Sequence, residues 1–249
     1  MAKAMLIDTS NCLYCNACTV ECKRENNVVV GRDIFWTRMD LHEVGQYPNV
    51  RQYFIKRACN HCTQAACVDV CPTGALYHHP DGFVVLDQAK CNGCGYCSQA
   101  CPFHIPQLDV VNPLTGQAKS NKCTFCVQRT ANGGATACSM ACPFGAITFG
   151  DRDELIAKGK ERVAALQARG VSKARLYGEN EMGGLHVLYV LEEEPEVYGL
   201  PANPQYPALA NVWQKIIQPL GNVAFGATIL GIIGAFFITR RKIRMEEVR

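Results

Sequence analysis

The sequence lacks a net charge over almost its whole length. Five of the 25 basic and two of the 22 acidic side chains fall in residues 240–249, which leaves 20 of each kind in residues 1–239. A nucleic-acid-binding domain needs a concentrated basic face. The balance therefore argues against a nucleic-acid partner.

Several functional signatures are also absent. The chain shows no nucleophile placed with a base, no phosphate-cradling glycine loop and no acidic pair. Its first residues, MAKAMLIDTS, lack the apolar h-region of a secretory signal. We therefore expect a protein that is not an enzyme by itself, and no secretory signal of its own.

Cysteine, in contrast, is abundant: there are 16, and none follows residue 142. Groups one and three have the spacing C-x2-C-x2-C-x3-C, and groups two and four are stretched between the second and third cysteines. The segments CPTGALYHH from Cys71 and CPFGAITFG from Cys142 repeat one unit, so the stretched groups belong to the same series. The four groups are Cys12, Cys15, Cys18 and Cys22; Cys59, Cys62, Cys67 and Cys71; Cys91, Cys94, Cys97 and Cys101; and Cys123, Cys126, Cys138 and Cys142.

Disulfides, zinc and iron-sulfur clusters are the three interpretations of these thiols. Disulfide scaffolds suit small secreted domains, and cysteines three residues apart bridge poorly with each other. Structural zinc uses two pairs of thiolates, whereas groups one and three place three thiolates in one tight loop. The spacing C-x2-C-x2-C-x3-C-P is typical of ferredoxins whose fourth cysteine ligates a second cluster. The sequence therefore predicts four [4Fe-4S] clusters, and it leaves open which groups pair.

The chain between the groups indicates an α+β fold of two duplicated, two-cluster ferredoxin-like modules. FVVLDQAKC and IPQLDVV, on either side of group three, read as strands, and one or two helical turns fit between Cys94 and Cys101. Gly93 and Gly95, which have no side chain, allow the loop backbone to come close to the cluster. We expect residues 1–150 to form this four-cluster domain with little regular secondary structure.

Beyond Gly150 the pattern changes to a helix-strand extension and connector, residues 151–210. Residues 151–170 predict an amphipathic helix with Asp151 and Glu154 as a capping box and Gly170 near its end. LHVLYVL, residues 185–191, predicts a strand, and residues 195–207 predict a proline-rich extended connector.

Residues 216–239 contain no charged side chain, which predicts a transmembrane helix within a segment 211–240, because a bilayer core needs about 20 apolar residues. Trp213 precedes it where an interfacial aromatic belongs. A buried core helix is the alternative. Basic residues crowd positions 240–244 while Lys215 stands alone before the span. The positive-inside rule then places the tail, residues 241–249, in the cytoplasm and the cysteine-rich body across the membrane.

The cysteine groups, CTFCVQR at 123–129, CPFGAITFG, GGLHVLYVL at 183–191 and VYGLP at 197–201 together resemble the iron-sulfur (beta) subunit of membrane-bound respiratory formate dehydrogenase. The resemblance covers nearly the whole chain. The cysteine groups are shared with the wider four-cluster subunits of molybdopterin oxidoreductases, and the segment 151–239 points to formate dehydrogenase. The segment from Cys22 to Cys59 is shorter than in the enterobacterial type.

This resemblance implies a heterotrimer in the bacterial inner membrane, with the cluster domain on the periplasmic side. A catalytic alpha subunit would carry a molybdenum or tungsten bis-pterin and a further [4Fe-4S] cluster, and a membrane gamma subunit would carry haem b. The chain would pass electrons from formate oxidation to haem and quinone in anaerobic respiration. Such subunits are exported folded, with the catalytic partner's twin-arginine signal. The resemblance leaves open a higher oligomer.

The resemblance also implies a nested ligand pairing, group one with four and group two with three. Cluster 1 would be held by Cys12, Cys15, Cys18 and Cys142; cluster 2 by Cys22, Cys123, Cys126 and Cys138; cluster 3 by Cys59, Cys62, Cys67 and Cys101; and cluster 4 by Cys71, Cys91, Cys94 and Cys97.

Residues beside the cysteines have plainer interpretations. Each group already has four thiols, so we expect surface or hydrogen-bonding roles for the neighbouring histidines, which are His61, His78, His79 and His104. Lys90 and Lys122 directly precede cysteines, and we expect both to be solvated. The alternatives for the whole chain are the same role in a membrane hydrogenase or a polysulfide, nitrite or sulfoxide reductase, and a zinc-bearing membrane adaptor.

Overall fold

The computed structural model describes residues 2–112, 114–212 and 216–246. The chain divides into two units, Met1–Pro207 and Ala208–Arg249. Trp213 and Lys215, on which the predicted interfacial aromatic and the charge before the span depend, lie outside the described residues, as do residues 247–249 of the predicted tail.

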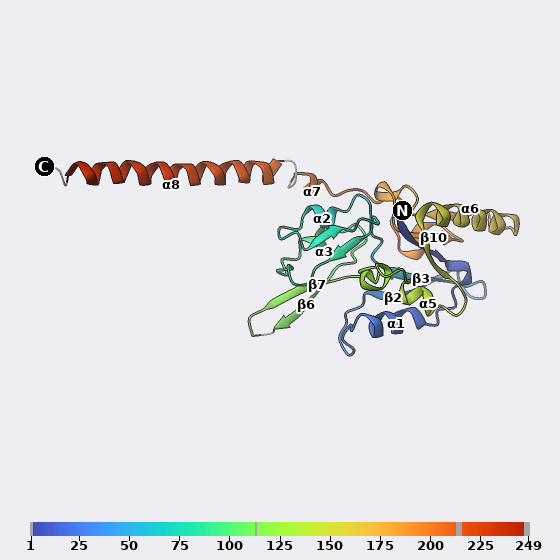
Figure 1. Ribbon diagram of the computed structural model, residues 1–249. Helices are drawn as coiled ribbons and strands as arrows, with labels where there is room; N and C mark the ends of the chain where they lie inside the picture. The colour runs from blue at the N-terminus through green and yellow to red at the C-terminus, as the bar shows by residue number, and fades with distance from the viewer. Residues whose placement is uncertain (1, 113, 213–215, 247–249) are drawn as a thin grey trace. The chain divides into compact units, whose positions relative to one another are not determined.

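A four-stranded sheet in the order β8-β1-β10-β9 organises the first unit (Figure 1). β1 (Lys3–Asp8) pairs in parallel with β10 (Val187–Leu191) and antiparallel with β8 (Ile147–Asp151). β9 (Arg175–Tyr177) pairs antiparallel with β10. The predicted strand at 185–191 is confirmed, and it joins a sheet with the start of the chain.

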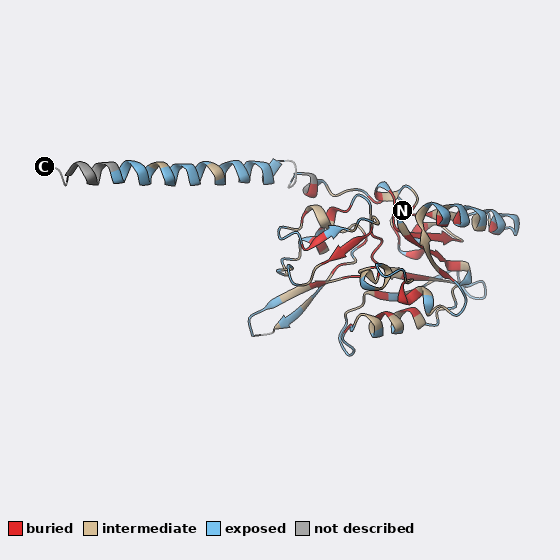
Figure 2. Ribbon diagram, viewed as in Figure 1, coloured by how far each residue is buried: buried red, intermediate tan, exposed pale blue. Residues whose placement is uncertain are grey.

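The two faces of this sheet serve different parts of the core, because successive strand residues point to opposite faces. Ala4 and Leu6 on β1 pack in a cluster with α6, whereas Met5 and Ile7 pack among cysteines. β10 is buried along its whole length, as a strand covered on both faces must be (Figure 2). The sheet is thus a wall between an ordinary apolar layer and the thiol-rich layer.

Helix α6 (Arg152–Ala168) covers the first face of the sheet. Leu155 and Leu166 are buried, as the predicted amphipathic pattern requires. The predicted capping box is wrong: Asp151 is the N-cap residue but makes no capping hydrogen bond with its side chain. Its carboxylate instead pairs with the Lys3 ammonium at 2.7 Å, because β1 and β8 place the two residues opposite each other. Gly170, with φ +93°, follows the helix end as expected.

Short elements fill the rest of the unit. Three hairpins are formed by β2 (Thr37–Val44) with β3 (Arg51–Ala58), β4 (Leu76–His78) with β5 (Val84–Leu86), and β6 (Gln107–Asn112) with β7 (Gln117–Asn121). The short helices are α1 (Ala17–Glu25), α2 (Ala66–Asp69), α3 (Tyr96–Ala100), α4 (Val127–Thr130) and α5 (Ala137–Met140), with the 3-10 turns η1 (Thr9–Asn11) and η2 (Glu181–Gly183). The predicted α+β fold with little regular secondary structure is confirmed.

The connector after β10 is held to the rest of the first unit by a buried tyrosine and by hydrogen bonds. The prediction of an extended segment is wrong for its start, because Pro195–Tyr198 forms the 3-10 helix η3 with Pro195 at its first position. Tyr198 is fully buried, and its hydroxyl accepts a hydrogen bond from the backbone N–H of Glu192 at 3.2 Å. Further along, the Tyr206 hydroxyl donates to the Asp69 carboxylate at 2.5 Å.

The second unit contains α7 (Ala208–Val212) and the long helix α8 (Gln218–Glu246). Residues 216–217 directly before α8 are π-helical, and Pro219 lies in the first turn of α8. The stretch Gln218–Arg240 is long and apolar enough to cross a membrane, with mean hydropathy 1.9. None of that stretch is buried, so it is not the core helix of a soluble unit. One C-terminal apolar helix is therefore present, as predicted.

Candidate metal centres

The four cysteine groups share one backbone feature. The residue just before the second cysteine of each group has a positive φ: Tyr14 at 56°, His61 at 50°, Gly93 at 75° and Phe125 at 61°. Left-handed residues in such loops turn successive backbone N–H groups towards one concave side. Three of the four positions are not glycine, and strained backbone of this kind is found at functional sites. The groups are thus four copies of one anion-favouring loop.

Gly93 shows why glycine is used in group three. A Cβ at this position would collide with the carbonyl oxygen of Ala118 on β7. The hairpin β6–β7 therefore packs directly on the loop only because residue 93 has no side chain. The approach seen here is to β7, and the predicted approach of Gly93 and Gly95 to a cluster stays a prediction.

The third cysteine of each group lies on a short helix that begins just after the loop. Cys18 is in α1, Cys67 in α2, Cys97 in α3 and Cys138 in α5. α1 packs against α5, and α2 packs against α3. These contacts bring group one beside group four and group two beside group three.

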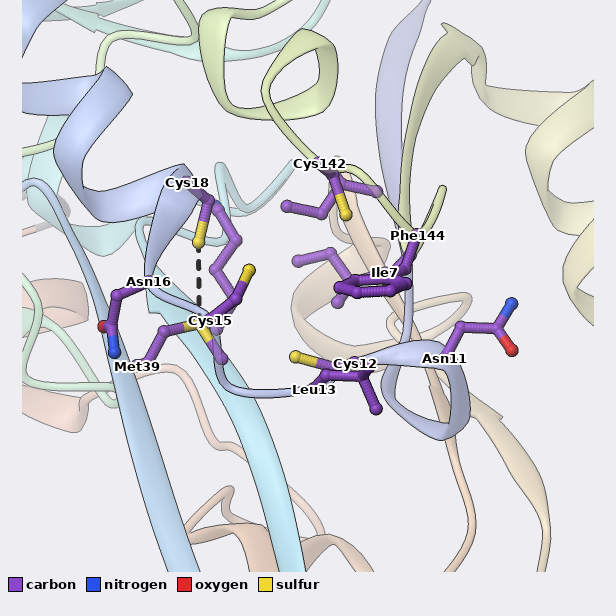
Figure 3. Close-up of a pocket in the computed structure, with 13 residues that line it drawn as sticks. Ile7, Asn11, Cys12, Leu13, Cys15, Asn16, Cys18, Met39, Cys142 and Phe144 are labelled. Atoms are coloured by element: carbon purple, nitrogen blue, oxygen red, sulfur yellow. Dashed lines mark hydrogen bonds between the residues drawn. The ribbon is translucent and has the colours of Figure 1, made fainter.

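Cys12, Cys15, Cys18 and Cys142 line one pocket (Figure 3). Its other walls include Ile7 of β1, and Met39 of β2, whose thioether sulfur lies 3.5 Å from the Cys18 sulfur. Three thiols from group one and the last thiol of group four thus face a common space.

A second pocket is lined by Cys71, Cys91, Cys94 and Cys97. Ser120 of β7 closes it: its backbone N–H donates to the Cys91 sulfur at 3.4 Å, and its hydroxyl lies 3.3 Å from the Cys97 sulfur. Hydrogen bonds to ligand sulfurs raise the reduction potential of a cluster.

Asn26, one residue after α1, connects two more thiols across groups. Its side-chain amide lies 3.8 Å from the Cys22 sulfur and 4.0 Å from the Cys126 sulfur. Burial, with a contribution from the charges of Cys138 and Cys126, raises the pKa of Cys22 to about 11. The fourth thiol of group one therefore lies among thiols of group four.

The remaining thiols, Cys59, Cys62, Cys67 and Cys101, interact electrostatically with one another. Burial, and then the charges of Cys59, Cys101 and Cys67, raise the pKa of Cys62 far above its ordinary value. A bound metal needs thiolates, so a positive centre must compensate both the burial and the crowding of these groups.

Among the residues that the structure describes, no group of three His, Cys, Asp or Glu side chains could hold a single metal ion. A cluster spreads its ligands over several iron atoms, which suits the wider spacing of these thiols.

Two buried lysines lie in this thiol-rich region, and the sequence analysis did not predict their burial. The expectation that Lys122 is solvated is wrong: it is 0% exposed and donates to the carbonyl oxygens of Val84 at 2.7 Å and Cys123 at 2.8 Å. Lys56, on β3, is 2% exposed. Burial lowers the pKa of Lys56, but the charges of nearby thiols outweigh that effect and keep the pKa above its ordinary value. Lys90 is solvated, as expected.

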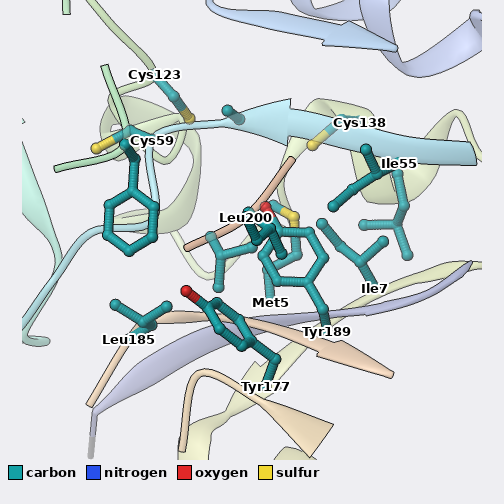
Figure 4. Packing of buried hydrophobic residues seen from close by; sticks show 14 of the residues in the cluster. Met5, Ile7, Ile55, Cys59, Cys123, Cys138, Tyr177, Leu185, Tyr189 and Leu200 are labelled. Carbon is teal, nitrogen blue, oxygen red and sulfur yellow. The ribbon is translucent and has the colours of Figure 1, made fainter. Parts of the chain in front are cut away.

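The histidines have the expected roles. His61 is fully buried; its Nδ1 accepts the backbone N–H of Val84 at 3.2 Å, and its ring meets Phe125 edge-on with centroids 4.6 Å apart. His78 and His104 are exposed, and the His79 Nδ1 lies 3.3 Å from the Asp81 carboxylate. The same apolar cluster contains Cys59, Cys123 and Cys138 (Figure 4).

Comparisons with known proteins give these loops a chemical identity. The family model described as a 4Fe-4S dicluster domain matches residues 50–152. The formate dehydrogenase iron-sulfur subunit of Haemophilus influenzae is 36% identical over 94% of this chain and 79% of the relative. The formate dehydrogenase-O iron-sulfur subunit of Escherichia coli strain K12 is 38% identical over 92% of this chain and 81% of the relative. The thiosulfate reductase electron transfer subunit PhsB of Salmonella typhi is 42% identical over 60% of this chain and 76% of the relative.

The fold and the thiol loops therefore define an iron-sulfur electron-transfer protein of the ferredoxin-like class. Within that class, the chain belongs to the family of formate dehydrogenase iron-sulfur subunits. Its role is that of the electron-transfer subunit of a formate dehydrogenase or a related reductase, and not that of the catalytic subunit.

Proposed function

We propose that this chain conducts electrons from a formate-oxidising catalytic subunit to a haem b subunit in the membrane and so to quinone. The catalytic subunit would carry a molybdenum or tungsten bis-pterin and a further [4Fe-4S] cluster. The observation that carries the proposal is the convergence of cysteines from distant groups into shared sites, on a chain whose relatives are named formate dehydrogenase iron-sulfur subunits.

The chain's own residues would hold four [4Fe-4S] clusters with the nested ligand sets. Cys142 with group one, and Cys71 with group three, line the two pockets described above, and this supports the assignment of clusters 1 and 4. The contacts of Asn26 with Cys22 and Cys126 support cluster 2, and the mutual charges around Cys62 support cluster 3. When bound, such clusters supply one-electron transfer.

The exposure of the thiols suggests where electrons enter and leave. Cys15 and Cys94 are the two exposed thiols, whereas the buried ones are Cys18, Cys22, Cys59, Cys97, Cys123 and Cys138. Cys15 belongs to the proposed cluster 1 and Cys94 to the proposed cluster 4. We infer that cluster 1 receives electrons from the catalytic subunit, that clusters 2 and 3 lie inside the path, and that cluster 4 delivers electrons to haem.

The apolar helix supports a single-pass anchor in the bacterial inner membrane, with lipid and the haem subunit around it. Gly221, Gly226, Gly231 and Gly234 have open space beside them, which suits close packing of another helix. The excess of basic residues after the helix supports a cytoplasmic C-terminus and a periplasmic cluster domain. Mass measurement in detergent tests whether the heterotrimer so formed assembles into a higher oligomer.

The first experiment is an anaerobic absorbance titration of the native complex extracted in detergent. Formate is added while the broad visible band of the oxidised clusters is followed. Bleaching by formate is the expected result. If dithionite bleaches the complex and formate does not, the formate assignment is wrong. A colourless complex without iron would instead favour the zinc-bearing adaptor.

The same role in another reductase is the second candidate. The identity of 42% to a thiosulfate reductase electron transfer subunit, over 60% of this chain, favours it. The catalytic chain that copurifies with this subunit decides between the two functions. A hydrogenase or a polysulfide, nitrite or sulfoxide reductase as that partner would replace the formate assignment and leave the electron-transfer role intact.

A further inference from the structure

Lys56 is a buried cation without a carboxylate partner. It lies on β3, its side chain is among the largest fully buried ones, and it forms no ion pair with a carboxylate in the described part of the chain. Within the described part of the chain, its Nζ donates one hydrogen bond, to the Met5 thioether sulfur at 3.8 Å. A thioether is a weak acceptor, and a buried charge without compensation is strongly unfavourable. Negative charge must therefore come from elsewhere.

Thiols of two different proposed clusters supply that negative charge. Lys56 lines the pocket that holds Cys12, Cys15, Cys18 and Cys142, the ligands proposed for cluster 1. The thiols whose charges act on it most are Cys138 and Cys123, proposed ligands of cluster 2, and Cys18. The ammonium group of Lys56 thus lines the first pocket, and its acceptor Met5 packs in the same core cluster as Cys123 and Cys138.

Lys122 and Lys90 differ from Lys56 in ways that matter for this role. The ammonium of Lys122 donates to two backbone carbonyls, which satisfy it locally. The ammonium of Lys90 is 62% exposed and lies 3.7 Å from the Asp87 carboxylate, so water, salt and Asp87 screen its charge. Of these three lysines, only Lys56 has thiols as the main groups that interact with its charge.

We propose that Lys56 is the shared countercharge of clusters 1 and 2, and that it raises the reduction potential of both. A cluster with thiolate ligands carries net negative charge, and taking up one electron makes it more negative. A fixed positive charge in a dry site stabilises the reduced form more than the oxidised form, and net charge and burial are known determinants of these potentials. The inference rests on the ligand sets of the proposed function.

The position also explains how β3 contributes to electron flow. Raising both potentials together leaves the driving force between clusters 1 and 2 unchanged and favours the reduction of cluster 1 by the catalytic subunit. Lys56 is therefore a positioning and tuning residue. It holds no iron itself.

The test is a redox titration of the purified complex followed by electron paramagnetic resonance, for wild type, Lys56→Met, Lys56→Arg and Lys90→Met. Methionine keeps the length of the lysine side chain and removes its charge. We expect Lys56→Met to lower the potentials of two of the four clusters that this chain holds. The expected loss is about tenfold in the reduction equilibrium, which is about 59 mV for a one-electron couple. Lys56→Arg and Lys90→Met should titrate like wild type.

Three outcomes would overturn the inference: Lys56→Met potentials equal to those of wild type, a shift of one cluster alone, or an equal shift of all four. If Lys56→Met loses iron, the iron content of Lys56→Arg decides. Full iron in Lys56→Arg supports the need for charge, and an equal loss in both variants contradicts it. The ligand sets are tested separately, because a wild-type complex without four titrating clusters would contradict the proposed function before any variant is compared.

Discussion

At the residue scale, the cysteine spacing predicts the chemistry and the structure adds the conformation that serves it. The thiols could be read directly from the sequence because cysteines at this spacing are the usual ligands of iron-sulfur clusters. The left-handed positions Tyr14, His61 and Phe125 could not, since side chains of this size rarely adopt a positive φ. Lys56 was missed because nothing in RQYFIKRA distinguishes a buried lysine from a solvated one.

The nested pairing predicts which single cysteine changes affect the same cluster. Cys71→Ser should alter the same resonance signal as Cys94→Ser, because both residues line one pocket. Cys101→Ser should match Cys62→Ser in the same way. The measurement is the electron paramagnetic resonance spectrum of each reduced complex, with its iron content. If Cys71→Ser instead reproduces the spectrum of Cys62→Ser, each group holds its own cluster and the nesting is wrong.

Gly93 predicts a packing defect at the loop of group three. Gly93→Ala adds a methyl group that would collide with the Ala118 carbonyl, and it also strains a backbone at φ +75°. We expect Gly93→Ala to lower the free energy of unfolding by about 2 kcal/mol or more, since left-handed strain alone costs about 1–2 kcal/mol. The matched control is Gly116→Ala on the same hairpin, where φ is +67° and nothing lies within 4 Å. Equal midpoints of thermal iron release in the two variants would contradict the role of the collision.

At the scale of elements, periodicity predicted what depends on local sequence. The strand at residues 187–191 and the helix at residues 152–168 form where the apolar pattern placed them. Their partners were not predictable, because the register of β1 with β10 depends on contacts across more than 180 residues. The capping box failed for the same reason: pairing of β1 with β8 gave Asp151 a lysine partner that its neighbours in the sequence do not reveal.

The layer between α6 and the sheet predicts a stability effect that is separate from the clusters. Leu166 is 4% exposed and packs with residues of β1 and β10. Leu166→Ala should destabilise the body by about 2–5 kcal/mol, the usual cost of such a cavity. Glu161→Ala, on the exposed side of α6, should stay within about 0.5 kcal/mol of wild type. Thermal unfolding followed by far-ultraviolet circular dichroism measures both, and equal midpoints would show that α6 contributes little.

At the scale of the whole molecule, the cysteines and the apolar helix belong to different units. All 16 cysteines precede Pro207, and the apolar stretch Gln218–Arg240 belongs to the unit that starts at Ala208. The sequence predicted both parts because each has a strong composition signal. The predicted domain boundary at residue 150 stays a prediction. Residues beyond that boundary contribute β10 to the sheet that begins with β1.

This separation predicts the behaviour of a chain that ends at Pro207. Because no proposed ligand lies beyond Cys142, the shortened chain should keep the iron content of the full chain. It should also be released from membranes by carbonate washing, because the apolar helix with mean hydropathy 1.9 is gone. A full-length chain with Gly226→Ala is the control that should remain in the membrane, since alanine fits the open space beside that position. Retention of the shortened chain in washed membranes would mean that the body itself contacts lipid or an integral partner, and loss of iron would mean that the second unit supports the cluster sites.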